Sequence, residues 1–232
     1  MTDGAIKAGA AVEADGTDAE RIAQLEGCYT SVIHDVMRAM GLRNFTLPPR
    51  IRPLQPEGVL TGPAFTLEGR IDETADAHAT LLAWTGLLSQ ARAGHVWVCQ
   101  PHNHLIAQMG ELSAETLQLK GVRGCVIDGA LRDTNFLLQL GFRAWGTHHT
   151  PRDIVGMWLP TATDAEIMIG EVAIRPGDWL HGDRDGMVRI PAGRLDDIIA
   201  ASVTAMNTES LVRKAILDGV DPQEAYLKFG KF

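Results

Sequence analysis

The segment that most constrains the fold is 124–133, which reads Gly-Cys-Val-Ile-Asp-Gly-Ala-Leu-Arg-Asp. A short apolar run bounded by glycine is typical of an interior strand. This strand ends in Asp128, and a tight turn then delivers Arg132 and Asp133 to one spot. Open α/β proteins usually bind ligands just beyond the carboxyl ends of such strands. Because an Arg can grip a carboxylate with two parallel hydrogen bonds and an Asp can hold a hard divalent cation, the pair favours an anionic small substrate activated by a metal.

Size, charge and cysteine content narrow the class of protein. The 232 residues are enough for a sizeable core, and the formal net charge of −8 argues against a general nucleic-acid binder. No apolar run approaches the roughly 18 residues that a membrane helix needs. Three widely spaced cysteines, Cys28, Cys99 and Cys125, are typical of reduced, buried thiols in a cytoplasmic protein. A nucleophilic Cys125 is disfavoured because no base is evident beside it.

The pattern along the chain predicts a flexible leader over residues 1–18 and a single α/β domain over 19–232, with a mixed central sheet and helices at both termini. Apolar spacing predicts helices over 19–40 with a break near Gly27, 76–91, 112–120, 134–140 and 193–217, and strands over 64–69, 94–99, 124–128 and 143–146. Thr30 or Ser31 is expected to cap the second helix and Gly41 to end it. Alternation over 165–191, with turns at 176–178 and 185–186, predicts hairpins.

Several residues have both a structural and a functional reading. Residues 110–113 open a helix, whose free N–H groups are either an anion site or part of an ordinary capped helix. Asp128 is expected to bond backbone in its turn rather than to bind metal. His102 and His104 form only a weak metal motif, and substrate contact is the more favoured of their two functional roles. Glu209 alone would be a solvated charge on a helix.

Five segments together resemble the RraA-like family, which includes the 4-hydroxy-4-methyl-2-oxoglutarate aldolases. They are 62–66, 110–113, 124–133, 177–186 and the C-terminal segment around Glu209. The resemblance covers most of the chain. It implies a swivelling β/β/α sandwich, assembled as a homotrimer or as a hexamer of two trimers, with active sites between subunits.

The resemblance also implies roles for charged residues. Asp133 would bind Mg²⁺ or Mn²⁺, and Arg132 would contact the keto acid. Glu111 would sit in the water shell of the metal, and Glu209 would reach that shell from the neighbouring subunit.

In the same way, the resemblance assigns the substrate carboxylate to the helix start at Gly110, where the backbone amides of Leu112 and Ser113 would bind it. The chain departs from the family at residues 100–104, where many members have a short acidic-Gly turn. This departure leaves the distal half of the substrate open, with His102 as a candidate contact there.

The expected function is a metal-dependent class II aldolase that cleaves a 4-hydroxy-2-oxo acid, such as 4-hydroxy-4-methyl-2-oxoglutarate, to pyruvate and a carbonyl product. The enolate formed in this cleavage is stabilised either by a Schiff-base lysine or by a divalent metal. The chain has five Lys, of which Lys120 alone lies near the proposed site, so the metal route is preferred. Oxaloacetate decarboxylation would follow, because it passes through the same enolate.

Two alternatives stay open. One is a non-catalytic RraA-like regulator that contacts a ribonuclease. The other keeps the fold and the metal but acts on another oxo acid, with His102, His104 and Trp145 shaping the pocket. In each enzyme reading the partner is a small oxo acid, with neither nucleic acid nor membrane involved.

Overall fold

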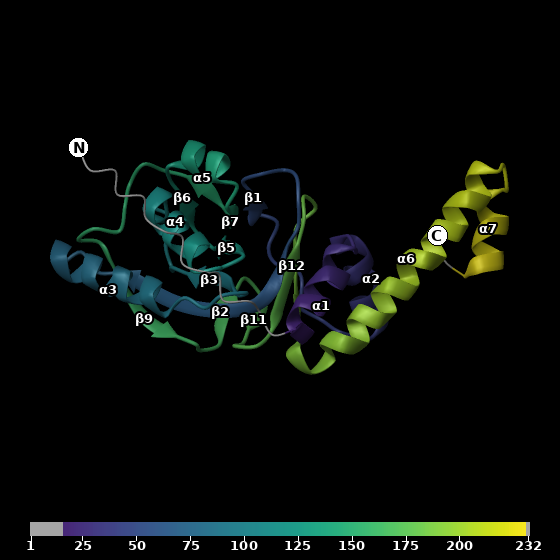
Figure 1. Cartoon of the computed structure of the whole chain (residues 1–232), viewed down its shortest axis with the longest axis horizontal. Helices are drawn as coiled ribbons and strands as arrows, with labels where there is room; N and C mark the ends of the chain where they lie inside the picture. The colour runs from purple at the N-terminus through teal and green to yellow at the C-terminus, as the bar shows by residue number, and fades with distance from the viewer. Residues whose placement is uncertain (1–15, 231–232) are drawn as a thin grey trace.

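A curled mixed sheet forms the centre of the computed structural model, which describes residues 16–230 (Figure 1). The strand order is β1-β7-β5-β3-β2-β12-β13, and β9 pairs with the far part of β2. Their bounds are β1 Arg52–Pro53, β7 Arg143–Gly146, β5 Gly124–Ile127, β3 Val96–Gln100, β2 Leu60–Ile71, β12 Trp179–Gly182, β13 Met187–Ile190 and β9 Trp158–Thr163. Strands β2, β3, β5 and β7 run parallel, whereas β1, β9, β12 and β13 are antiparallel to their neighbours. The predicted mixed sheet and α/β class are confirmed.

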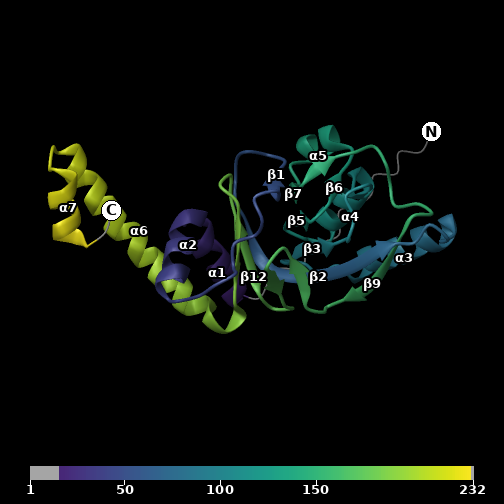
Figure 2. The same ribbon diagram turned by 180° about the vertical axis from the view of Figure 1, so that it is seen from behind.

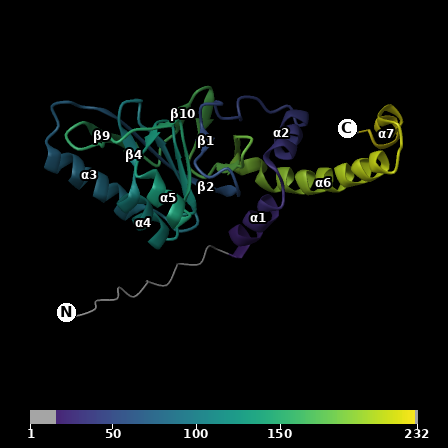
Figure 3. The same ribbon diagram turned by 90° about the horizontal axis from the view of Figure 1, so that it is seen from above.

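The alternation of side chains along the central strands creates two different buried faces. Trp97 and Cys125 point toward helices α3 (Ala77–Gln90), α4 (Glu111–Leu119) and α5 (Thr134–Leu140). Val98 and Val126 point the other way, toward the hairpin of β10 (Ile167–Ile169) and β11 (Val172–Ile174). Helices and hairpin thus enclose the sheet from opposite sides (Figure 3), which gives the β/β/α layering that the resemblance implies.

A separate helical layer covers the β12–β13 end of the sheet. Helices α1 (Gly16–Glu26), α2 (Thr30–Ala39) and the first half of α6 (Leu195–Leu217) share one core with these strands. Beyond that core α6 runs away from the body, and α7 (Pro222–Phe229) folds back against it (Figures 1 and 2). The short turn of 3-10 helix Ala192–Arg194 leads into α6.

A fully buried histidine lies in this end of the sheet. His181 of β12 is opposite Thr61 of β2 and Val188 of β13, and none of its surface is exposed. Burial lowers the pKa of His181 to about 4, although the nearby Asp183 carboxylate and the backbone of Cys28 oppose the shift.

The start of the chain differs from the sequence prediction at two points. Helix α1 begins at Gly16, so residues 16–18 belong to a helix and not to the predicted leader, whose other residues lie outside the described residues. Capping of the second helix by Thr30 or Ser31 is wrong: Tyr29 is its N-cap and makes no side-chain cap bond. Instead the backbone N–H of Thr30 donates to Asp183 Oδ2 at 2.8 Å, so a distant hairpin supplies the missing acceptor.

The hairpin prediction over 165–191 is correct for only one of its two turns. Strands β12 and β13 pair around residues 183–186, as predicted. The turn at 176–178 joins β11 to β12, which belong to different sheets, and the other hairpin turns instead at Gly170–Glu171, between β10 and β11. Periodicity located the strands but could not show which of them pair.

The cysteines match their predicted state. Cys28, Cys99 and Cys125 are buried and unpaired. Burial raises the pKa of each thiol, which argues against a nucleophilic role for Cys125. Among residues 16–230, no helix is long and apolar enough to cross a membrane.

Candidate active site

A second, small parallel sheet sets up the candidate site. Its strands are β4 (Ala107–Met109), β6 (Ala130–Leu131) and β8 (His148–His149), in the order β4-β6-β8. Residues Asp128 and Gly129 alone separate β5 from β6, so the tight turn predicted after β5 is really the passage into this sheet. Because β4 and β6 are parallel, the residues that follow them, Gly110 and Arg132, come to the same edge.

The two segments at this edge approach very closely. The backbone N–H of Arg132 donates to the Met109 carbonyl at 2.9 Å, and that of Glu111 donates to Asp133 Oδ2 at 3.2 Å. A Cβ atom on Gly110 would lie 2.6 Å from Asp133 Oδ2 and 2.9 Å from Arg132 Cγ. Lack of space therefore requires glycine at position 110. Its backbone conformation does not, because φ −145° is extended and open to any residue.

Asp133 has an unusual backbone conformation. It is the N-cap of α5 with φ 52° and ψ 35°, in the left-handed region, and its side chain does not cap that helix. Asp133 therefore does not act as a capping carboxylate for its own helix. Its carboxylate meets the first amide of α4 instead, at the positive end of that helix dipole.

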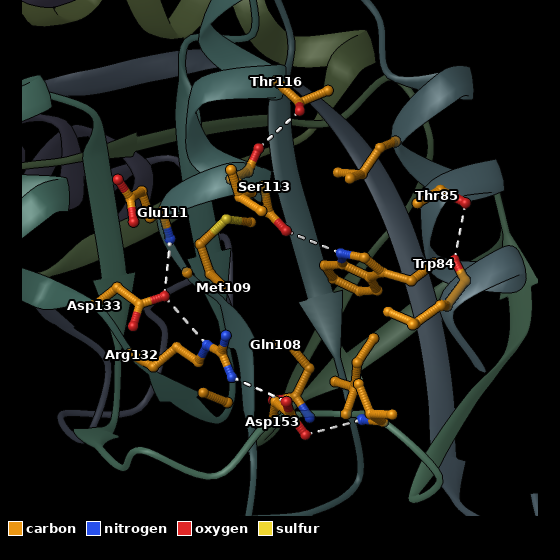
Figure 4. Close-up of a pocket in the computed structure, with 17 residues that line it drawn as sticks. Trp84, Thr85, Gln108, Met109, Glu111, Ser113, Thr116, Arg132, Asp133 and Asp153 are labelled. Carbon is orange, nitrogen blue, oxygen red and sulfur yellow. Dashed lines mark hydrogen bonds and ion pairs between the residues drawn. The ribbon is translucent and has the colours of Figure 1, made fainter. Parts of the chain in front are cut away.

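The Arg132 guanidinium is held between two carboxylates (Figure 4). Its Nε lies 3.2 Å from Asp133 Oδ2, and its Nη1 lies 3.2 Å from Asp153 Oδ2. The other oxygen of Asp153 accepts the backbone N–H of Val155 at 3.1 Å. About a third of the side chain of Arg132 is exposed, so its orientation is fixed while its outer face stays available to a ligand.

These groups open into a pocket of about 470 Å³ between α3 and α4. Its other wall is apolar and includes Trp84, Leu88 and Ile154. Trp84 Nε1 donates to Ser113 Oγ at 2.9 Å, which ties α3 to the first turn of α4 (Figure 4). The hydroxyl of Ser113 is thus occupied, while helix geometry leaves the amides of the first turn without intrahelical acceptors.

Six of the predicted site residues share this pocket: Gly110, Glu111, Leu112, Ser113, Arg132 and Asp133. Glu209 does not, because it lies on α6 and borders a separate hollow with Tyr29 and Val212. Among the described residues of one chain, the structure therefore does not bring Glu209 to Asp133.

The histidines and Trp145 lie elsewhere. His102 has φ 51° and its ring contacts the Glu68 carboxylate; it does not line the pocket. The ring of His104 lies near that of His148 in a tilted arrangement, with centroids 6.3 Å apart and an interplanar angle of 49°. The expectation that Trp145 shapes a pocket is wrong, because it is 1% exposed and belongs to the core under the β10–β11 hairpin.

Asp128 has a different partner from the one expected. Its two oxygens accept hydrogen bonds from Arg50 Nε at 2.7 Å and Arg50 Nη2 at 2.8 Å, and Gln100 donates a third at 2.9 Å. Burial alone would raise the pKa of this carboxyl, but the Arg50 and Gln100 bonds outweigh it and lower the pKa. Asp128 is structural, as predicted, but through a buried ion pair with a residue 78 positions earlier.

The donor set fits a cation held mainly by water. Among residues 16–230, no three His, Cys, Asp or Glu side chains gather into a metal-binding group. Mg²⁺ usually keeps several waters and takes only one or two carboxylates, with the substrate supplying further oxygens. The carboxylate of Asp133, whose side chain is about a third exposed, suits that coordination, with Glu111 beside it.

Sequence reasoning missed Asp153 and Trp84. Asp153 follows β8 in a loop without any motif, and only the fold brings it to Arg132. Trp84 could be recognised as a core residue of a helix, but not as a pocket wall.

Fold and site together define an α/β protein whose pocket joins a helix N-terminus to an Arg-Asp pair beyond two parallel strands. The chain belongs to the RraA-like family, whose model, described as Aldolase/RraA, matches residues 30–189. It is 29% identical over 210 residues to a Halalkalibacterium halodurans protein named "Putative 4-hydroxy-4-methyl-2-oxoglutarate aldolase", covering 89% of this chain and 93% of that one. An Albidiferax ferrireducens protein of the same name is 33% identical over 153 residues, 64% of this chain and 86% of its own.

A solved structure supports the same assignment. The chain superposes on Streptomyces coelicolor RraAS2, described as an unusual member of the RNase ES inhibitor RraA protein family, with a TM-score of 0.75. Sequence identity is 26%, and the match covers 87% of this chain and 98% of that one.

Proposed function

We propose that this protein is a divalent-metal-dependent lyase that cleaves a 4-hydroxy-2-oxo acid to pyruvate and a carbonyl product. The observation that carries the proposal is the meeting of Arg132 and Asp133 with the N-terminus of α4 in one pocket. The names of the two aldolase-like relatives support the reaction type.

The first turn of α4 is suited to the carboxylate of the keto acid. The amides of Leu112 and Ser113 point out of the helix start, where the helix dipole favours negative charge. Arg132, pinned by Asp133 and Asp153, adds positive charge beside it. A 2-oxo acid bound this way places its keto oxygen near the guanidinium.

Cleavage transfers the proton of the C4 hydroxyl to a base, and the O–H electron pair forms the carbonyl of the second product. The C4 hydroxyl loses its proton, the C3–C4 bond breaks, and its electrons form the enolate of pyruvate, which is then protonated at C3. Arg132 would stabilise the charge that develops on the enolate oxygen, an effect that can contribute several kcal/mol when the donor is preorganised. A Mg²⁺ or Mn²⁺ ion held by Asp133 would supply further Lewis-acid stabilisation when bound.

Proton transfer at C4 needs a base. Glu111 lies beside Asp133 in the pocket and would position a water that accepts the hydroxyl proton. In a homotrimer or hexamer, Glu209 of a neighbouring copy would complete this water site. Oxaloacetate would lose CO₂ in the same pocket, because its decarboxylation forms the same enolate.

The test is pyruvate release from 4-hydroxy-4-methyl-2-oxoglutarate and oxaloacetate, with Mg²⁺ and then with excess EDTA. We expect release from at least one substrate, lost with chelator and in Asp133→Ala. Asp164→Ala is the matched control, since Asp164 pairs with Arg92 outside the pocket. Near-full activity in Asp133→Ala would refute the assignment.

The similarity to a member of a ribonuclease-inhibitor family favours one second candidate, a regulator acting by protein contact. This reading predicts no turnover of any oxo acid and no binding of Mg²⁺, together with inhibition of a ribonuclease that persists in Asp133→Ala.

A further inference from the structure

The charges lining the candidate pocket are strongly unbalanced. Its walls hold one cationic side chain, Arg132, and three carboxylates, those of Glu111, Asp133 and Asp153. Two of these carboxylates already pair with Arg132. Arg152, although next to Asp153 in the chain, is exposed and does not line the pocket.

The excess of carboxylates in the pocket limits how many negative charges a bound substrate can carry. A divalent cation would offset the excess of two negative charges, and the keto-acid carboxylate would take the α4 amides and Arg132. A second substrate carboxylate would then find no cation among the described pocket residues. An unpaired charge inside a pocket is costly, because it loses water without gaining a partner.

The part of the pocket away from Arg132 is mostly apolar, and the hydroxyls of Thr85 and Thr116, which also line the pocket, donate to backbone carbonyls of their own helices. Trp84, Leu88 and Ile154 are 6%, 7% and 6% exposed, and they form a wall under the rim residues Leu81 and Val155. The indole N–H of Trp84 is already bonded to Ser113, so the ring offers only carbon surface to a ligand.

From these two observations we infer that the preferred substrate is a monocarboxylic 4-hydroxy-2-oxo acid whose distal group is uncharged and apolar, and that Leu81 and Trp84 help to select it. The inference rests on the proposed lyase function. Cleavage then yields pyruvate and an uncharged aldehyde or ketone, whereas a substrate with a carboxylate at C4 is disfavoured.

A matched pair of substrates tests this. 4-Hydroxy-4-methyl-2-oxoglutarate and 4-hydroxy-4-methyl-2-oxohexanoate differ in carrying a carboxylate or an ethyl group at C4, and both release pyruvate. With Mg²⁺ present we expect kcat/KM to favour the ethyl compound by at least about tenfold, the scale that pocket complementarity commonly provides.

Two variants locate the distal group. Leu81→Lys puts a cation at the apolar rim, and we expect it to shift the kcat/KM ratio toward the carboxylate substrate by about tenfold. Leu82→Lys is the matched control, because Leu82 is the next residue of α3, is more exposed, and does not line the pocket. Equal ratios in the two variants would overturn the assignment of the distal group to this wall.

Deuterium exchange at C3 of pyruvate tests the lyase function separately from the substrate specificity, because the exchange needs enolate formation but no distal group. Exchange together with equal or better cleavage of the carboxylate substrate would overturn the specificity inference and leave the lyase function standing. Absence of both exchange and cleavage would overturn the lyase function, and the inference with it.

Discussion

Between pH 7.5 and pH 5, acidification should destabilise this protein mainly through the buried His181. Its side chain is fully buried in β12, and its pKa falls from 6.5 to about 4. Between these values the unfolded chain binds a proton at this position and the folded chain does not. Folding stability therefore decreases as the pH falls through this window.

The size of the effect follows from the two pKa values. The linkage relation gives a loss of about 2 kcal/mol between pH 7.5 and pH 5, and about 3.4 kcal/mol once the pH is below both values. Asp183 is the charged neighbour that opposes the shift, so removing its carboxylate would enlarge the loss.

Urea unfolding at pH 7.5 and pH 5 measures this directly, with His181→Gln as the non-titrating comparison. We expect the free energy of unfolding of the variant to fall by about 2 kcal/mol less than that of the native chain over this interval. A ring NMR titration of His181 gives a second readout, with an inflection near pH 4. Equal pH dependence in the two proteins would refute the reasoning, whatever the stability of the variant at pH 7.5.

Two further predictions concern the site and its support. Gly110→Ala should reduce turnover by about a hundredfold or more, because its Cβ would displace Asp133, while Gly193→Ala, with nothing within 4 Å of its added Cβ, should leave turnover unchanged. Circular dichroism should show that both variants fold. Asp128→Asn should cost about 2 kcal/mol at pH 7, because it removes the buried carboxylate charge that pairs with the partly exposed Arg50 guanidinium; a change under 0.5 kcal/mol in urea unfolding would contradict this.

The sequence predicted those features that local chemistry determines. The bounds of α5 and β7 agree with the pattern, because glycine ends the helix and a short apolar run forms the strand. Segment 124–133 located Arg132 and Asp133, and residues 110–113 located the helix start that meets them. Each of these signals lies within about ten residues of chain.

Features that depend on distant contacts were not predictable in this way. Arg50 reaches Asp128, and Asp183 caps the helix at Thr30, across 78 and 153 residues respectively. The three short strands β4, β6 and β8 are too brief for periodicity to detect, and they pair with one another in a small separate sheet. Asp153 reaches Arg132 because this small sheet brings the loop after β8 to the edge where Arg132 lies.

The left-handed backbone at Asp133 sets stability and activity against each other. A non-glycine residue with φ 52° carries a local conformational cost that glycine would not, of up to about 1 kcal/mol for Asp. Selection for thermal endurance alone would therefore favour glycine at position 133, at the expense of the carboxylate that faces Arg132 and α4. Engineering of higher thermal stability should therefore keep Asp133 and place stabilising substitutions elsewhere in the fold.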